Sequence, residues 1–418
     1  MIFFKNTVLF VLLLATITSA RAQDTLKITL QQADSLFLQN NFRLLAAAMN
    51  VDAVKAEIIQ AKLFPNPVFT ADLNAYDPQN RKLLHVGKTG QKVFQMEQVI
   101  RLAGKRKAEI EMARSNAALA ELELVQLTQQ LKFQLHSDLF ALGQYAQLLR
   151  SYTGQLALLD TLLKSYQQQA DLGNLPLKDV VRLKGAYLKL NNDRAEVYKD
   201  YYEVHANLQV LLQTNSPLVF DFKEEDILRY IKAHPLPDIR TEAQLNRIDL
   251  KIAQQNKELA DLNQQYQVKL AKPDINVFTS YDQRGGAFNN QINAGLSIPL
   301  PFFHRNQGNI KMAEYRVKEA DLNVQAVQAE ADASLSNAYQ SYKQVVTEYK
   351  KAAPLYNEDF EITGKGMTEN FRKQNVSMIE FIDFFEAYNE VQVELARIKS
   401  QLVVSAEKLN LLIGKDMF

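Results

Sequence analysis

The feature that most constrains this chain is an internal repeat. Residues 110–113 read Ile-Glu-Met-Ala and recur at 310–313 as Ile-Lys-Met-Ala, and the Ala-Tyr pair at 186–187 recurs at 387–388. A third match pairs Leu208, Leu211 and Leu212 with Leu409, Leu412 and Ile413. The three matches keep their order and a nearly constant spacing of 200 or 201 residues. The sequence therefore predicts a duplicated chain, and such a repeat has to be recognised before any fold is assigned.

The start of the chain is typical of an exported protein. Lys5 precedes an apolar run at 8–17, and the small-residue pattern Ala-Arg-Ala at 20–22 precedes Gln23. This order predicts a cleaved signal peptide over 1–22 with Gln23 as the mature start. A short membrane anchor is the alternative, but the run is well under the roughly 20 residues that a spanning helix needs. We expect no other helical anchor, which leaves the periplasm, the outer membrane or the medium.

Each repeat begins with a helix of heptad character that a proline ends. The periodic apolar positions are Phe37, Leu44, Val51 and Ile58 in the first repeat, and Leu245, Ile248, Ile252, Leu259, Leu262 and Tyr266 in the second. Pro65 follows the first helix and Pro273 follows the second. Because proline cannot continue a helix, these residues mark the helix ends.

After each proline the sequence period changes to two. Residues 291–298 alternate apolar and polar side chains, which predicts a strand with one apolar and one polar face. Its predicted partner is 274–281. In the first repeat, 68–76 and 92–100 form the corresponding pair, joined by a polar loop at 77–90. Each repeat is therefore expected to contribute one β-hairpin.

A very long helix follows each hairpin. No proline interrupts 102–172, and a helix of about 70 residues would be roughly 105 Å long. In the second repeat, apolar or small residues recur every seven positions from Ile310 to Ala352. A sustained seven-residue period indicates coiled-coil packing. Both long helices are expected to run to a short break, from which a return helix leads to about Leu212 or Ile413.

The two breaks occupy matching positions in the repeats. We call residues 173–176 the first tip and residues 374–377 the second tip. Their predicted functional members are Gly173, Asn174, Leu175, Pro176, Asn375, Val376 and Ser377. The predicted organisation is a signal peptide (1–22), a first repeat (23–213), an equatorial linker containing three prolines (214–240) and a second repeat (241–418).

Composition argues against several functional classes. Lys and Arg number 48 against 47 Asp and Glu, for a net charge of +1, so the basic excess of a nucleic-acid binder is missing. There is no cysteine, and the five histidines form no pair at helical metal-binding spacing. We predict no catalytic, cofactor-binding or metal-binding residues, and therefore no enzyme.

Two glycine-containing motifs have simple structural interpretations. Gly364 and Gly366 lack the third glycine of a dinucleotide loop and follow no strand, so we interpret them as a helix interruption. The basic run Gly-Lys-Arg-Lys at 104–107 lies between a predicted strand and a predicted helix. A solvated or interface-facing turn explains that run better than a phosphate site.

The predicted strands cannot form a complete structure within one chain. Two hairpins cannot close a barrel, and open sheet edges are not tolerated in lipid. Twelve strands from three symmetric copies would close. The predicted fold class is thus mainly α with a small β part. The long coiled-coil helices would form a tube below the strands. The resemblance described next implies that this tube is a periplasmic α-barrel and that four strands per chain complete a twelve-stranded trimeric outer-membrane β-barrel.

This order of elements, repeated twice, resembles the TolC family of outer-membrane efflux ducts. The resemblance covers essentially the whole mature chain, and its best local motifs are Leu-Ala-Gly-Lys-Arg at 102–106, Ile-Pro-Leu-Pro-Phe-Phe at 298–303 and the two tips. The Gly-Lys-Arg stretch is similar to the heavy-metal-efflux branch, the CzcC type. Several relatives carry a lipidated N-terminal cysteine, which this chain does not have.

The resemblance implies a homotrimer in the outer membrane of a Gram-negative bacterium, with helices extending into the periplasm. It implies docking of the tips to a periplasmic adaptor (membrane fusion) protein, for which we expect Leu175 and Val376 to be exposed. It also implies an inner-membrane pump, often of the resistance-nodulation-division type. It also suggests that Glu380, Asp383 and the first-repeat residue Asp179 surround the periplasmic aperture, although Arg182 in the first repeat breaks the acidic pattern. No cofactor and no nucleic acid are implied.

Three alternatives remain open at this stage. An outer-membrane duct of a type I protein secretion system would have the same architecture. A periplasmic coiled-coil scaffold would have no barrel, and the alternating strand at 291–298 counts against it. A secreted enzyme would need a cluster of titratable residues that the sequence does not show. The exported substrate, whether metal cations, small toxic compounds or protein, cannot be read from the sequence.

Overall fold

The computed structural model describes residues 25–232, 234–285, 287–356 and 358–418. The predicted signal peptide and Gln23 lie outside these residues. The described chain is mainly helical with few strands, as the sequence predicts. Among the described residues, no helix combines the length and the apolar character that crossing a membrane would require.

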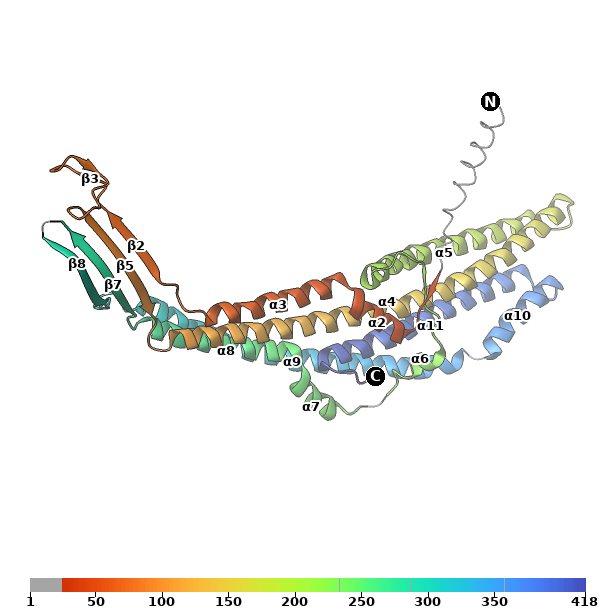
Figure 1. Cartoon of the computed structure of the whole chain (residues 1–418). Helices are drawn as coiled ribbons and strands as arrows, with labels where there is room; N and C mark the ends of the chain where they lie inside the picture. Colours follow the sequence, from red (N-terminus) through yellow and green to blue (C-terminus); the bar gives the residue numbers. More distant parts are fainter. Residues whose placement is uncertain (1–24, 233, 286, 357) are drawn as a thin grey trace, which may run out of the picture. The chain divides into compact units, whose positions relative to one another are not determined.

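The first repeat contains the predicted helices and hairpin in the predicted order (Figure 1). Its elements are β1 (Leu26–Lys27), α2 (Leu30–Asn40), α3 (Phe42–Lys62), β2 (Val68–Leu73), β3 (Tyr76–Asp77), β4 (Lys82–Leu83), β5 (Gln91–Ile100), α4 (Lys105–Asp171) and α5 (Leu177–Leu212). The predicted polar loop at 77–90 thus contains the small β3–β4 hairpin.

The linker and the second repeat follow the same plan. Their elements are β6 (Leu218–Val219), α6 (Glu224–Leu228), α7 (Leu236–Asn246), α8 (Ile248–Leu270), β7 (Ile275–Arg284), β8 (Phe288–Ser297), α9 (Gln307–Ala352), the 3-10 turn η2 (Ala353–Leu355), α10 (Glu358–Arg372) and α11 (Met378–Ile413). The return helices α5 and α11 are both 36 residues long, and their bounds lie 201 residues apart. The duplication seen in the sequence is therefore present in the structure.

The chain divides into two compact units, and each unit takes segments from both repeats. The sheet unit comprises 46–126 and 248–330. The tip unit comprises the described residues up to 45, together with 127–247 and 331–418. The units thus cut across the boundaries between repeats, because corresponding elements of the two repeats pack together.

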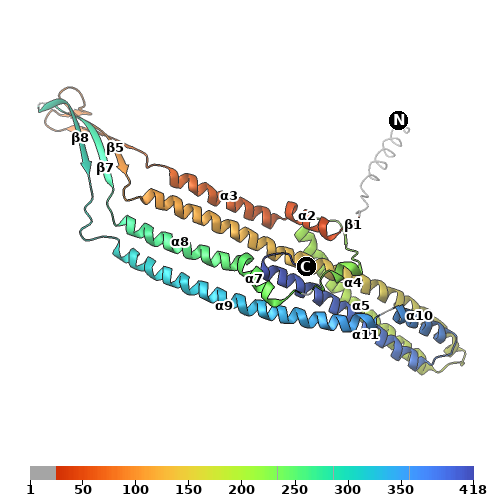
Figure 2. The same cartoon turned by 90° about the horizontal axis from the view of Figure 1, so that it is seen from below.

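Both hairpins join in one sheet within the sheet unit. The order is β2-β5-β7-β8, with every neighbouring pair antiparallel (Figure 1; β5, β7 and β8 are also labelled in Figure 2). The repeats meet at β5 and β7, which pair from Gln91 opposite Arg284 to Ile100 opposite Ile275. Within the described chain, β2 and β8 each pair on one side only, so the sheet is open at both edges.

The helix that opens each repeat is broken, which the heptad pattern did not predict. Asn41 separates α2 from α3, and its buried side chain donates from Nδ2 to the Leu211 carbonyl at 2.9 Å. Its Oδ1 accepts from the backbone N–H of Leu44 at 3.1 Å and so caps α3. In the second repeat Arg247 separates α7 from α8 and donates from Nη1 to the Ala331 carbonyl at 2.8 Å. Both breaks are held by contacts between distant segments.

The second long helix differs from the first. It is interrupted at Ala353–Leu355, where Pro354 lies, before α10 leads to the second tip. The interruption expected at Gly364 and Gly366 is wrong, because α10 runs through both residues. A Cβ on Gly364 would lie 2.8 Å from the Tyr388 ring, so this glycine allows α10 and α11 to approach closely.

Candidate functional site

The four-stranded sheet has a mainly apolar face and a mainly polar face, although the first also carries Lys92, Gln98, Thr279 and Gln283 and the second Val68, Val93, Val99 and Phe278. The strand register places these apolar residues on one face: Phe69, Ala71, Leu73, Phe94, Met96, Ile100, Ile275, Val277, Tyr281, Ile292, Ala294 and Leu296. The other face carries Thr70, Asp72, Gln95, Glu97, Asn276, Ser280, Asp282, Gln291, Asn293 and Ser297. Ile292 is 77% exposed and Leu296 is 65% exposed, so the apolar face is uncovered within one chain at these positions. The alternation predicted for 291–298 is confirmed.

The basic run after β5 anchors the junction between strand and helix. Lys105 is buried, and its Nζ donates to the Lys272 carbonyl at 2.6 Å and to Asp274 Oδ1 at 2.8 Å. Arg106 donates to the Lys62 carbonyl at 3.0 Å and lies over the Phe64 ring. The expectation of a solvated turn is therefore wrong for Lys105, which holds together segments from both repeats.

The two tips share one backbone design. Gly173 and Gln374 adopt left-handed backbone angles, with φ of 78° and 61°. In each tip the next residue, an asparagine, donates its backbone N–H to the carbonyl five residues earlier, at 2.9 Å in both cases. These contacts satisfy carbonyls at the end of the preceding helix. The matching turns predicted from the sequence are thus present at equivalent positions.

The apolar side chains exposed at the tips are not the ones that the sequence predicts. Leu175 and Val376 were expected to be exposed, but both are half-buried, and Val376 packs against the apolar core of the tip unit. The exposed side chains are Leu172 (71%) and Leu177 (63%), which flank the first tip, and Ile379 (53%), which follows the second. The apolar surface available to a partner therefore lies beside the turns.

The core under the tips joins the two helical hairpins. It contains Tyr152, Leu156, Leu159 and Leu162 of α4, Leu183 and Leu190 of α5, Phe371 of α10, and Met378, Phe381 and Phe385 of α11. The Phe371 and Phe381 rings stack with centroids 4.1 Å apart. Phe381 and Phe385 therefore pack inside the tip unit.

The three candidate aperture acids have different surroundings. Glu380 accepts from the Ser377 backbone N–H at 2.9 Å and from its hydroxyl at 2.7 Å, which completes a capping box at the start of α11. These hydrogen bonds lower the pKa of Glu380. Asp383 is exposed on the same helix, whereas Asp179 lies half-buried in the first turn of α5. Glu380 therefore has a structural role that sequence analysis did not predict.

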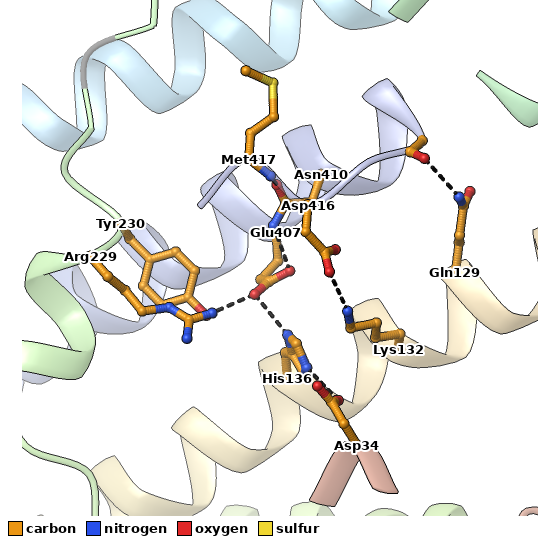
Figure 3. A network of polar contacts seen from close by, with 11 residues as sticks. Asp34, Gln129, Lys132, His136, Arg229, Tyr230, Glu407, Asn410, Asp416 and Met417 are labelled. Atoms are coloured by element: carbon orange, nitrogen blue, oxygen red, sulfur yellow. Dashed lines mark hydrogen bonds and ion pairs between the residues drawn. The ribbon is translucent and has the colours of Figure 1, made fainter. Parts of the chain in front are cut away.

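A buried network of charged and polar side chains lies elsewhere in the tip unit (Figure 3). His136 of α4 lies 2.8 Å from Glu407 of α11 through Nδ1 and 2.8 Å from Asp34 of α2 through Nε2. Glu407 also accepts from the Tyr230 hydroxyl at 2.7 Å and from Asn410 Nδ2 at 3.0 Å. The network thus links α2, α4, α11 and the inter-repeat linker.

The ionisation of this network follows from its contacts. Burial alone would lower the pKa of His136, but hydrogen bonds with Asp34 and Glu407 raise it to about 9. Burial alone would raise the pKa of Glu407, but hydrogen bonding and charge from His136 lower it to about 2. At neutral pH the two groups therefore form a buried ion pair. No sequence motif predicts it, because the partners are 271 residues apart.

The described residues contain no candidate metal centre. No group of three or more His, Cys, Asp or Glu side chains among the described residues is placed to hold a metal ion. The features that stand out are the two-faced sheet with open edges, the paired tips and the buried network.

Comparisons with known proteins find one similar sequence and several similar folds. No protein-family model matches the chain. The cobalt-zinc-cadmium resistance protein CzcC of Cupriavidus metallidurans is 26% identical over 297 residues, which cover 70% of this chain and 67% of CzcC. Among solved structures, CusC has a TM-score of 0.75 at 17% identity and covers 92% of both chains. The Campylobacter jejuni CmeC outer membrane channel has a TM-score of 0.74 at 14% identity, covering 92% of this chain and 85% of CmeC.

The fold is therefore that of the outer-membrane efflux channels. The resemblance to the TolC family of outer-membrane efflux proteins, and within it to the heavy-metal-efflux branch, is confirmed. CmeC is an outer membrane channel and VceC of Vibrio cholerae an outer membrane protein, which is the location predicted for this chain. These relatives are channel and resistance proteins rather than enzymes, which supports the predicted non-enzymatic role.

Proposed function

We propose that this chain is the outer-membrane component of a tripartite efflux system, a passive homotrimeric duct. The observation that carries the proposal is the open four-stranded sheet with one apolar face. Three copies would pair their edges into twelve strands, with the apolar face toward lipid and the polar face toward the lumen. In this arrangement α4, α5 and α9–α11 line or surround the periplasmic part of the duct.

The partners and cargo follow from the same proposal. The tips would dock to a periplasmic adaptor protein, which connects the duct to an inner-membrane pump of the resistance-nodulation-division type. Metal cations are the favoured cargo, because CzcC is a cobalt-zinc-cadmium resistance protein and the Gly-Lys-Arg run at 104–106 is similar to that branch. The polar face of the sheet suits hydrated cations. The sheet also counts against a periplasmic scaffold without a membrane part.

The proposal is tested by single-channel recording. We expect the purified protein to insert into planar lipid bilayers and to conduct ions in discrete steps. The same protein with Ile292→Lys and Leu296→Glu, which place charges on the apolar face, should insert rarely, because charges facing lipid are costly. A wild-type protein that gives no conductance in any lipid mixture would contradict a duct.

We further propose that Glu380 and Asp383, with Asp179, surround the periplasmic aperture. Glu380 and Asp383 are three residues apart on α11 and share a face of the helix. Three copies would place six of these carboxylates in a ring. Like charges a few ångströms apart repel by about 1 kcal/mol in water and by more in a confined opening, so the ring would attract cations.

Replacing both acids, Glu380→Gln with Asp383→Asn, should weaken divalent-cation block and cation selectivity in bilayer recordings. Two single variants separate charge from helix capping. Asp383→Asn removes a charge and leaves the capping box, whereas Ser377→Ala removes the cap and keeps both charges. Selectivity should change in the first variant and persist in the second. Unchanged block and selectivity in the double variant would place the pair away from the pore.

A further inference from the structure

Two grooves in the tip unit carry opposite charges. The acidic groove, about 660 Å³, lies between α5 and α11, and its acidic lining residues are Asp193, Glu196, Asp200, Glu386, Glu390 and Glu394. The basic groove, about 670 Å³, is lined by α4, α10 and α11, and its charged lining residues are Arg150, Lys365 and Lys399. None of the described side chains that line the basic groove is acidic.

Much of this charge is not neutralised within the chain. In the acidic groove, Lys189 pairs with Glu386 at 3.3 Å, and Arg397 donates to Glu394 at 2.8 Å. The other four carboxylates have no ion-pair partner among the described residues. Burial raises the pKa of Asp193. The positive charge of Lys189 lowers this pKa, and the negative charges of Glu196 and Glu386 raise it.

The basic groove also leaves charge available. Lys399 pairs with Glu224 at 2.6 Å. Arg150 and Lys365 are exposed and have no ion-pair partner within the described chain. Two opposite charges that face solvent in one chain are suited to meet in an assembly, where desolvation strengthens their attraction.

Both grooves also contain buried amide atoms without a hydrogen bond. Within the described chain, Gln144 Nε2 and Gln155 Oε1 in the basic groove and Asn389 Oδ1 in the acidic groove have no partner. Buried polar atoms almost always find a partner in a complete structure. These atoms mark polar positions along the walls of both grooves.

Arg150 of the basic groove and Glu196 of the acidic groove lie at the same distance from the first tip. Arg150 precedes Gly173 by 23 residues and Glu196 follows it by 23 residues, so each lies roughly 35 Å along its helix from the first tip. In a cyclic assembly whose axis runs along the helices, neighbouring copies are related by rotation alone. Two residues that meet across an interface therefore lie at similar heights along the axis. A basic side and an acidic side at the same height meet this requirement.

We propose that the acidic groove between α5 and α11 receives the basic α4–α10 side of a second copy of this chain. Arg150 and Lys365 of one copy then face Asp193, Glu196 and Glu390 of its neighbour. This interface is heterologous, and with the three-fold rotation of the proposed homotrimer it closes into a ring. The inference rests on the proposed homotrimer and identifies the surfaces and charges through which its helical part associates.

Charge exchange tests the interface. Reversing the basic side with Arg150→Glu and Lys365→Glu, or the acidic side with Glu196→Lys and Glu390→Lys, should raise the trimer dissociation constant in detergent by about tenfold or more. Combining all four substitutions should restore it to within a few-fold of the wild type. The matched control is Lys164→Glu, an exposed charge on α4 that does not line the groove. The proposal would be overturned if neither reversal changed the trimer dissociation constant. It would also be overturned if the effects of the two reversals added in the combined variant instead of cancelling.

Cross-linking provides a second measurement that does not depend on charge. The chain has no cysteine, so copies carrying Arg150→Cys and differently tagged copies carrying Glu196→Cys can be co-expressed and treated with a short bis-maleimide. We expect covalent products that contain both tags, and none when Lys164→Cys replaces Arg150→Cys. A wild-type trimer without these products would overturn this interface and leave the duct in place, with the grooves then open to an adaptor protein. A monomeric wild type would contradict both proposals.

Discussion

The substitution His136→Leu should lower the free energy of unfolding by about 3 to 5 kcal/mol, because it leaves Glu407 buried without its ionic partner. Both side chains are 3% exposed, so water cannot replace the lost contact. The double variant His136→Leu with Glu407→Leu should lose much less, because it removes the uncompensated charge as well. Thermal unfolding of the detergent-solubilised protein, followed by circular dichroism, measures both effects.

The matched control is His304→Leu, since His304 is exposed. The control should unfold at the wild-type temperature. The ion pair does not stabilise the tip unit if His136→Leu also unfolds at the wild-type temperature, or if the double variant unfolds at a lower temperature than His136→Leu.

The same pair predicts how stability depends on pH. The pKa of His136 rises from 6.5 to about 9 on folding, so its contribution is complete below pH 6.5 and is lost as the pH rises through about 9. The pKa of Glu407 falls from 4.5 to about 2, so its contribution is complete above pH 4.5 and is lost as the pH falls through about 2. The difference in stability between the wild type and the double variant should be largest between pH 4.5 and 6.5.

The second large effect is expected at the first tip. Leu172→Asp and Leu177→Asp should each reduce metal export to the level of a strain that lacks this chain. Both side chains are exposed beside the turn, so each substitution would remove an apolar contact with the adaptor. Docking would also bury the charge of the introduced aspartate, which is costly. Trimer assembly should be unaffected, because neither residue belongs to the core under the tips.

The structure also explains why the turns themselves are poorer test positions. Val376 packs against the core, so Val376→Asp would impair folding as well as docking. Leu188→Asp is a matched control, since Leu188 is 64% exposed on the same helix as Leu177 but lies away from the tip. Wild-type export in both tip variants, at normal protein level, would show that the first tip does not dock.

The parts of the fold that the sequence predicts are those set by local pattern. The alternation at 291–298 specifies a two-faced strand, and the absence of proline allows α4 to run for 67 residues. The tips were predictable because the same break recurs 201 residues later. In each case a short stretch of chain contains the whole signal.

The features that escaped prediction depend on contacts between distant segments. The breaks at Asn41 and Arg247 are stabilised by the Leu211 and Ala331 carbonyls, which no heptad pattern reveals. Lys105 looked like a surface residue because its partners at 272 and 274 belong to the other repeat. For Leu175 and Val376, the half-buried position follows from how the two hairpins pack, and a turn sequence alone does not specify it.

The central claim is that three copies of this chain form one membrane-inserted duct, and native mass spectrometry tests it most directly. The protein would be extracted with mild detergent from the outer-membrane fraction of its host and measured with the detergent removed in the gas phase. We predict a single species with three times the mass of the mature chain, since only association removes the open edges of β2 and β8. A monomer recovered from the soluble periplasmic fraction would contradict the account.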